Sequence, residues 1–245
     1  MPTLQEAWTS LKRNPVPVYA YVLAMMAAGA LYGAIDFGIT QIIEEEHPPA
    51  WMPLYNAGMQ VFFSALAGAI QAAALAMLGR ELDKPLWKCE GGVAGLRRFL
   101  LPWFIINLLF HAAMMTEIRA AQTESQGLLA TAEVLIVMMY VFAVPVGACV
   151  MFWGRFEWSE LGEALSPLTT QIRLTLIVAL LGFVGYFVHA LYIEFLVRGY
   201  WTPIIGPALI QLPFATVDLL QFAVVWDICR LHRSTDDAHD DPFSF

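Results

Sequence analysis

Six long apolar stretches, separated by short polar segments, dominate the pattern of hydrophobic and polar positions along the chain. Each stretch carries few or no charges and has about 20 to 26 residues, enough for an α-helix to cross a hydrocarbon layer roughly 30 Å thick. The stretches cover residues 16–39, 53–78, 99–118, 128–152, 172–197 and 203–228. The alternation that is typical of membrane β-strands does not occur. The pattern therefore predicts an all-α fold, a polytopic transmembrane helical bundle of six spans.

Composition supports this class. Of the 245 residues, 59% are hydrophobic and 14% are charged, and the mean hydropathy is +0.62. These values exclude a soluble enzyme with a single core and make the lipid bilayer the first expected partner. The net charge of −8 argues against a nucleic-acid partner.

The chain is expected to divide into two parts. Residues 1–232 form the integral membrane domain, and residues 233–245 form an acidic, disordered cytoplasmic tail. The tail carries several aspartates, which keep it solvated; docking to a basic partner is the alternative.

The placement of basic residues predicts the orientation. All but two of the 13 Lys and Arg flank the same side of the six spans, and Arg119 and Arg198 are the exceptions. Basic residues in short loops stay on the cytoplasmic side during insertion, so we expect both termini in the cytoplasm of a cell with the protein in its inner (plasma) membrane. A cleaved signal at the first span is the alternative, which the length of that span disfavours.

Tryptophans gather near the predicted span ends, as amphipathic rings at headgroup level do. We expect most of them to be interface anchors: Trp51, Trp103, Trp153, Trp158, Trp201 and Trp226.

The three cysteines, Cys89, Cys149 and Cys229, fall on the reducing side of this topology without any paired zinc spacing. This disfavours both a disulfide and a zinc site.

The chain resembles itself at regular intervals. Residues 79–98 match residues 154–173, with the same Gly-Arg start and the same spacing to a second Arg, and residues 11–17 match residues 96–102. These matches predict three tandem two-span repeats around an axis along the membrane normal. Interfacial helices are expected in two connecting segments, 81–97 and 156–171.

Small residues and prolines mark helix contacts. Gly29 and Gly33 lie one turn apart in the first span and predict close packing against another helix. Pro145, Pro207 and Pro213 are expected to kink the returning helices.

Ionisable residues inside the spans are few and energetically costly, so each needs a partner, a cavity or an interface. The ligand- or ion-binding candidates are Asp36, His111, Glu117, Glu133, His189, Glu194 and Asp218. Under the predicted orientation, most of them lie toward the outer leaflet. The spacing of Gln211, Asp218 and Gln221 also predicts a shared polar face on the last span. Polar groups that only pack helices together, or reach headgroups, are the alternative.

Four of these residues are candidate ligands for a divalent metal: His111, Glu117, His189 and Glu194. Their spacing within one helix does not place them on a shared face, so a metal would need ligands from different helices. A haem held by His111 and His189 is disfavoured, because one histidine on each of two helices is also what interhelical hydrogen bonding produces.

No catalytic signature accompanies these residues. The nucleophile elbow, the zinc-protease motif, the phosphate loop, the dinucleotide fingerprint and Cys-x-x-Cys do not occur, so catalytic residues stay unassigned and a non-enzyme is favoured. We expect a membrane protein that binds or transports a cation, proton or small solute through an outer-leaflet His/carboxylate cluster. The alternatives are a non-catalytic membrane subunit or assembly factor of a larger complex, and a metal- or haem-dependent intramembrane redox enzyme.

Overall fold

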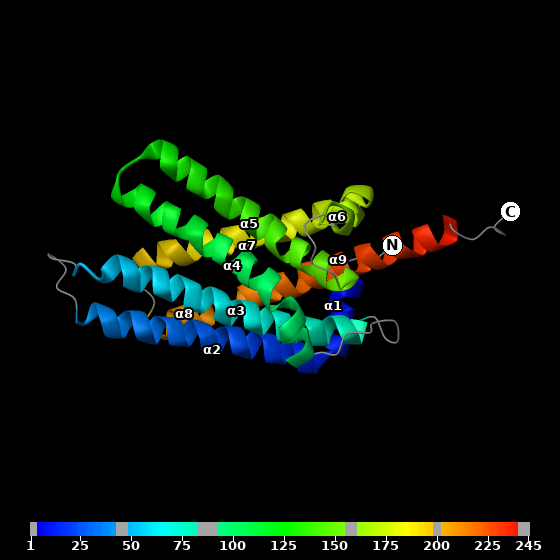
Figure 1. Cartoon of the computed structure of the whole chain (residues 1–245), viewed down its shortest axis with the longest axis horizontal. Helices are drawn as coiled ribbons and strands as arrows, with labels where there is room; N and C mark the ends of the chain where they lie inside the picture. The colour runs from blue at the N-terminus through cyan, green and yellow to red at the C-terminus, as the bar shows by residue number, and fades with distance from the viewer. Residues whose placement is uncertain (1–3, 43–48, 83–92, 155–160, 198–201, 240–245) are drawn as a thin grey trace.

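The computed structural model describes residues 4–42, 49–82, 93–154, 161–197 and 202–239. In these residues the chain forms helices and no strands (Figure 1). The helices are α1 (Leu4–Arg13), α2 (Pro15–Thr40), α3 (Met52–Leu82), α4 (Val93–Gln122), α5 (Gln126–Trp153), α6 (Leu161–Thr170), α7 (Ile172–Val197), α8 (Ile205–Leu209) and α9 (Gln211–His239).

Six helical segments are long and apolar enough to cross a membrane, which confirms the predicted fold class. They are formed by α2, α3, α4, α5, α7 and the joined pair of α8 and α9. The short helices α1 and α6 lie outside them. Because α6 falls in the segment 156–171, a helix is present in the second of the two connections expected to carry one. Most of the first connection, 81–97, lies outside the described residues, so the threefold repeat stays a prediction.

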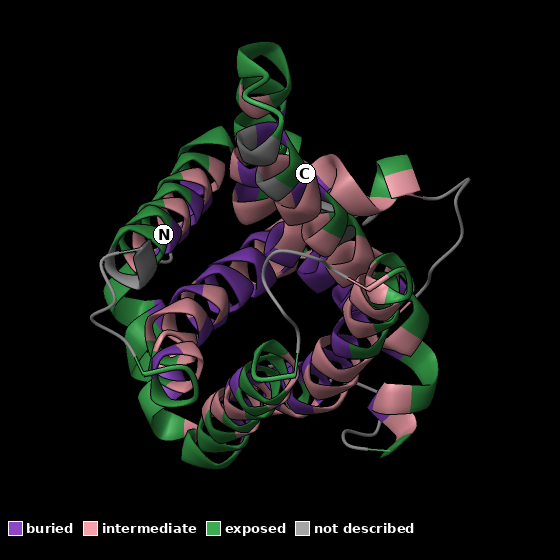
Figure 2. Ribbon diagram, turned by 90° about the vertical axis from the view of Figure 1, so that its left-hand side faces the viewer, coloured by how far each residue is buried: buried purple, intermediate pink, exposed green. Residues whose placement is uncertain are grey.

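The long helices run side by side along the length of the molecule, and α9 lies among the others (Figure 1). Helices α3 and α4 form the most extensive contact, α4 also packs against α5, and α2 packs against α3 and α8. Helix α9 contacts α1, α2, α5, α6 and α7. Viewed along the bundle, buried residues turn inward and exposed residues turn outward (Figure 2). Many of the exposed residues are large and apolar, such as Leu23, Leu54 and Leu180, and an exterior of this kind suits a lipid solvent.

The two ends of the bundle differ in charge. The basic end carries Lys12, Arg13 and Arg80 and is the one where α1 and α2 meet, α3 ends and the C-terminal part of α9 lies. The opposite end carries the α2–α3 and α4–α5 connections (Figure 1). Helix α1 packs its buried Ala7 and Leu11 onto the core there and contacts α9. Which side of the membrane each end faces stays a prediction. Helix α9 continues to His239, so residues 233–239 of the expected tail are helical, and residues 240–245 lie outside the described part.

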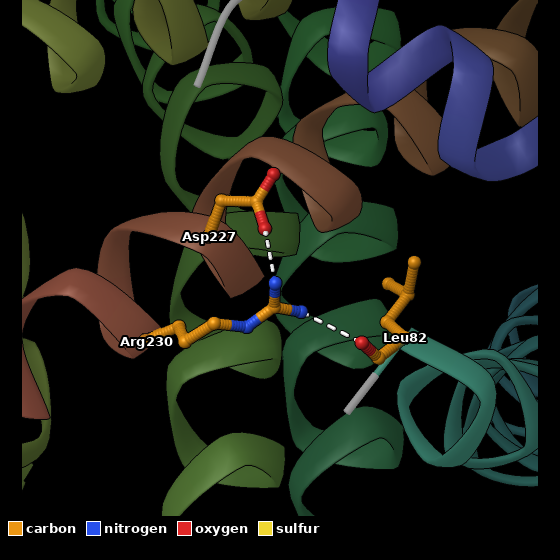
Figure 3. Close-up of polar contacts among 3 residues, drawn as sticks. All are labelled: Leu82, Asp227 and Arg230. Atoms are coloured by element: carbon orange, nitrogen blue, oxygen red, sulfur yellow. Dashed lines mark hydrogen bonds and ion pairs between the residues drawn. The ribbon is translucent and has the colours of Figure 1, made fainter. Parts of the chain in front are cut away.

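Arg230 fastens α9 to the end of α3 at the basic end (Figure 3). One guanidinium nitrogen lies 3.5 Å from the Asp227 carboxylate, and another donates a hydrogen bond of 2.7 Å to the Leu82 carbonyl oxygen. This carbonyl is among the last four of α3, which have no partner within their own helix. The contact therefore caps α3 while it positions α9.

Trp226 of α9 belongs to the buried core. Its ring is fully buried, stacks on Phe222 at 5.2 Å between centroids and meets Phe152 edge-on at 5.0 Å. Gly79 makes room for it, because a Cβ at that position would come within 2.6 Å of the indole. The expectation that Trp226 anchors the membrane interface is therefore wrong.

Trp103 of α4 departs from the same expectation. It is also fully buried, its Nε1 donates to the Met151 sulfur at 3.1 Å, and its ring packs where Gly147 has no side chain. A tryptophan near a span end can face either lipid or neighbouring helices, and here the neighbours have glycines that admit it. Trp51, 45% exposed, remains consistent with an anchor. Trp158 and Trp201 lie outside the described residues.

The predicted close packing at Gly29 and Gly33 is confirmed. A Cβ at Gly29 would overlap the carbonyl oxygen of Pro207, and one at Gly33 would overlap that of Pro203. Helix α2 therefore touches the backbone of the segment that leads through α8 into α9. Such approach requires residues without side chains at the contact.

Two of the three cysteines face one another. Cys149 of α5 and Cys229 of α9 are buried free thiols whose sulfur atoms lie 3.7 Å apart. Cys89 lies outside the described residues.

Candidate functional site: a polar network between four helices

Asp218 of α9 meets Tyr21 of α2 inside the bundle. The Tyr21 hydroxyl donates a hydrogen bond of 2.7 Å to a carboxylate oxygen of Asp218, and Tyr21 is fully buried. Within the described residues no Lys, Arg or His pairs with this carboxylate. An aspartate in the apolar part of a span is costly, and one hydroxyl only partly offsets that cost.

Amide side chains continue the contact across the bundle. The side chain of Gln71 on α3 lies close to the Tyr21 hydroxyl. Its side-chain oxygen accepts a hydrogen bond of 2.5 Å from the Asn107 amide of α4, which also donates to the Trp103 carbonyl at 2.7 Å. Gln71 is buried. Side-chain hydrogen bonds thus join α9 to α2 and α3 to α4, and Gln71 lies between the two pairs, close to Tyr21.

His111 of α4 extends this arrangement by one turn. Its Nδ1 lies 2.9 Å from the Asn107 carbonyl oxygen and 3.0 Å from the hydroxyl oxygen of Ser64 on α3. A carbonyl oxygen only accepts, so Nδ1 carries the proton when it bonds to Asn107, and Nε2 of the neutral ring is then the acceptor. We refer to Tyr21, Ser64, Gln71, Asn107, His111 and Asp218 as the polar network.

A second pair of ionisable residues lies nearer the opposite end. Glu117, in the last two turns of α4, comes 3.7 Å from Nε2 of His189 on α7. This is an ion-pair distance, too long for a direct hydrogen bond. His189 is 4% exposed, and its ring lies 5.8 Å from that of Tyr140 on α5. The pair therefore joins α4 and α7 beside an aromatic side chain.

The other three candidate residues lie at the surface. Asp36, Glu133 and Glu194 are all exposed. Asp36 and Glu194 are within about one turn of the ends of α2 and α7, where a carboxylate reaches headgroups or water. The seven predicted residues are therefore distributed over the polar network, the Glu117–His189 pair and the surface, with no single cluster among those described.

The geometry also bears on the metal and haem interpretations. Of the four predicted metal ligands, only Glu117 and His189 come together, and no group of three or more His, Cys, Asp or Glu gathers anywhere in the described part of the chain. A protein-bound zinc ion takes at least three protein ligands. His111 directs Nδ1 at Ser64 and Asn107, as expected of interhelical hydrogen bonding.

Sequence reasoning missed Tyr21 and Ser64 as partners. A tyrosine hydroxyl in an apolar span needs a hydrogen-bond acceptor, and this was the available signal.

The residues of the polar face predicted for the last span contact different helices. Asp218 turns to α2, whereas Gln221 donates to the Tyr140 and Val178 carbonyls of α5 and α7, at 3.2 and 3.1 Å. Gln221 is thus a packing residue.

Comparison with known proteins does not narrow the function. A scan against protein-family models, a search of curated proteins and a search of solved structures found no match. The fold nevertheless defines the class: this is a multi-pass helical membrane protein with six candidate membrane spans.

Proposed function

We propose that this protein binds a small cation in the polar network and passes it across the membrane. The observation that carries the proposal is the Asp218 carboxylate, which meets Tyr21 within the bundle and has no cationic partner in the described residues. A negative group in a low-dielectric region attracts positive charge strongly. A cation bound there would offset the cost of burying the carboxylate.

The polar network that begins at Asp218 and Tyr21 suits a cation. Gln71 and Asn107 supply amide oxygens, and Tyr21 and Ser64 supply hydroxyl oxygens, which are the ligand types that replace the hydration shell of alkali and alkaline-earth ions. Amide groups coordinate ions but do not exchange protons readily. The part of the network between Gln71 and Asn107 therefore favours a cation over a proton.

The Glu117–His189 pair provides a second attractive point for a cation closer to the opposite end. A cation that approaches Glu117 would compete with His189 for the carboxylate, since the two side chains are 3.7 Å apart and not directly hydrogen-bonded. Two such points at different depths are what a cation pathway requires, because binding must be strong enough for entry and weak enough for release.

Asp218→Asn is expected to reduce cation flux by about tenfold or more, since each loss of roughly 1.4 kcal/mol in binding free energy lowers occupancy tenfold. The measurement is flux into proteoliposomes under a fixed membrane potential, with sodium, potassium and calcium as separate probes and a trapped pH dye to detect protons. Asparagine keeps the shape of the side chain and removes its charge.

Glu163→Gln is the matched control, because it removes an exposed carboxylate from α6, away from the network. We expect wild-type flux from it. If Asp218→Asn lowers the melting temperature but leaves the flux unchanged, the network only packs helices together and the proposal fails. If the trapped pH dye alone reports flux, the transported ion is a proton and not sodium, potassium or calcium.

A second candidate function, a subunit of a larger membrane complex, rests on Glu133. This residue is exposed on α5, seven residues after Gln126 and hence about 10 Å along the helix. Its neighbours Val134 and Leu135 are 62% and 45% exposed. A carboxylate among exposed apolar side chains is costly against lipid, and a partner helix with a hydrogen-bond donor would remove that cost.

Under this second function, another chain should co-purify with the protein at fixed stoichiometry in a mild detergent, and Glu133→Ala should release it. An interhelical hydrogen bond in a membrane is worth about 0.6 to 2 kcal/mol, so a loss of roughly threefold or more in recovered partner is expected. The Glu163→Gln variant should retain the partner. A monodisperse single chain from the native membrane would contradict this candidate.

A further inference from the structure

A pocket opens at the basic end of the bundle, at the junction of α1 and α2 and beside the last turn of α3. It encloses about 530 Å³. Its lining includes Arg13, Asn14, Val16, Met77, Arg80 and Glu81. None of these residues belongs to the polar network, so the pocket is separate from the proposed cation pathway.

The pocket is cationic. Arg13 and Arg80 both line it, both are exposed, and neither is paired with another residue in the described part of the chain. Lys12 precedes Arg13 in the sequence, and its ammonium group lies 5.2 Å from the ring centroid of Trp8. Among the described residues that line it, Glu81 is the one acidic residue, so two guanidinium groups face one carboxylate. This charge balance selects an anion.

The first turn of α2 supplies one further donor. The Asn14 side chain does not cap the helix, because its amide donates to the Ser10 carbonyl at 2.9 Å. Pro15 and Pro17 have no N–H group, so Val16, which lines the pocket, carries the one N–H of this turn that has no partner within the helix. Such a group favours a phosphate oxygen. It adds to the two arginines and does not define the site by itself.

The surroundings of the pocket fit a lipid better than a soluble anion. Val16 and Tyr19 are 68% and 64% exposed on α2, where the apolar span begins, and Leu4 and Trp8 of α1 are 43% and 45% exposed. Helix α1 thus has the apolar face and the basic last turn of a helix lying at a membrane interface. The acyl chain of a phospholipid can lie along α2 while the phosphate of its headgroup reaches the pocket.

We propose that this pocket binds the headgroup of an anionic phospholipid, with Arg13 and Arg80 holding the phosphate oxygens. Guanidinium groups bind phosphate through paired, charge-assisted hydrogen bonds. Glu81 repels a second anion and limits the site to one headgroup. The lipid joins α1, α2 and α3 at one point and stabilises the interfacial position of α1.

The test uses delipidated full-length protein in a neutral detergent. Phosphatidylglycerol is titrated while the melting temperature is followed, and native mass spectrometry counts retained lipids. Phosphatidylcholine and inorganic phosphate are titrated in parallel. Variants are Arg13→Gln, Arg80→Gln and the double substitution, with Arg173→Gln as the control, because it removes an exposed cation from the start of α7 and leaves the pocket intact.

Phosphatidylglycerol should raise the melting temperature of the wild type and of Arg173→Gln, and phosphatidylcholine and inorganic phosphate should not. Each pocket arginine should contribute about fivefold in apparent affinity, and the double variant should lose roughly 25-fold. Arg13→Lys keeps the charge and should lose less than Arg13→Gln, which distinguishes binding from a folding defect. Equal affinity in the double variant, or equal stabilisation by phosphatidylcholine or by free phosphate, would overturn the proposal.

Discussion

Trp226→Ala is expected to lower the free energy of unfolding by about 3 to 5 kcal/mol, the range for truncating a buried aromatic side chain. The loss arises because the indole is fully buried, stacks on Phe222 and fills the space left by Gly79. The substitution leaves a cavity that α3, α5 and α9 cannot close without moving their backbones. Thermal unfolding in detergent, followed by intrinsic fluorescence and by retention of a monodisperse peak, measures the effect.

Trp51→Ala is the matched control for this prediction. Trp51 is 45% exposed and makes an edge-on contact with Tyr55 at 5.9 Å. Its truncation should cost about 1 kcal/mol or less. Similar melting temperatures for the two variants would show that Trp226 faces lipid, and the described packing of α9 would then be incorrect.

Gly29→Ala together with Gly33→Ala is expected to destabilise the bundle by about 3 kcal/mol, the upper part of the range for overpacking. Each added methyl group meets a backbone carbonyl, that of Pro207 or of Pro203, and backbone cannot rotate away as a side chain can. Helix α2 must therefore move outward from α8, which also separates Tyr21 from Asp218. Cation flux should fall along with the melting temperature.

Gly38→Ala tests whether this loss comes from the contact. Gly38 is on the same helix and has open space where a Cβ would be built. Because alanine favours a helix over glycine, this variant should be neutral or stabilised by up to about 1 kcal/mol. Destabilisation by Gly38→Ala of the same size as the double variant would contradict the close α2–α8 approach.

The spans and the glycine contact could be predicted because each depends on local sequence. An apolar run of sufficient length crosses a bilayer whatever its neighbours are, and the six segments agree with the expected ranges to within a few residues at most ends. Gly29 and Gly33 share a helix face by their spacing alone. Their partner, the carbonyls of Pro203 and Pro207, could not be predicted in this way.

The candidate site was predictable only as a set of unusual residues. Asp218, His111, Glu117 and His189 stood out because ionisable groups are rare in apolar spans. Their partners did not, since Asp218 and Tyr21 are 197 positions apart in the chain. The tryptophans show the same limit: Trp51 and Trp226 both lie near span ends, yet one is exposed and the other fully buried.

The sequence by itself determined the class of this protein, the number of its spans and the end at which positive charge gathers, because these depend on composition summed along each segment. Only the tertiary structure decided that Asp218 meets Tyr21, that Glu117 meets His189 and that two arginines share a pocket. Such contacts depend on the rotation of each helix about its axis and on the choice of its neighbours. In an all-apolar helix no hydrophobic face specifies that rotation, so the fit of glycines, aromatic rings and scarce polar groups sets it.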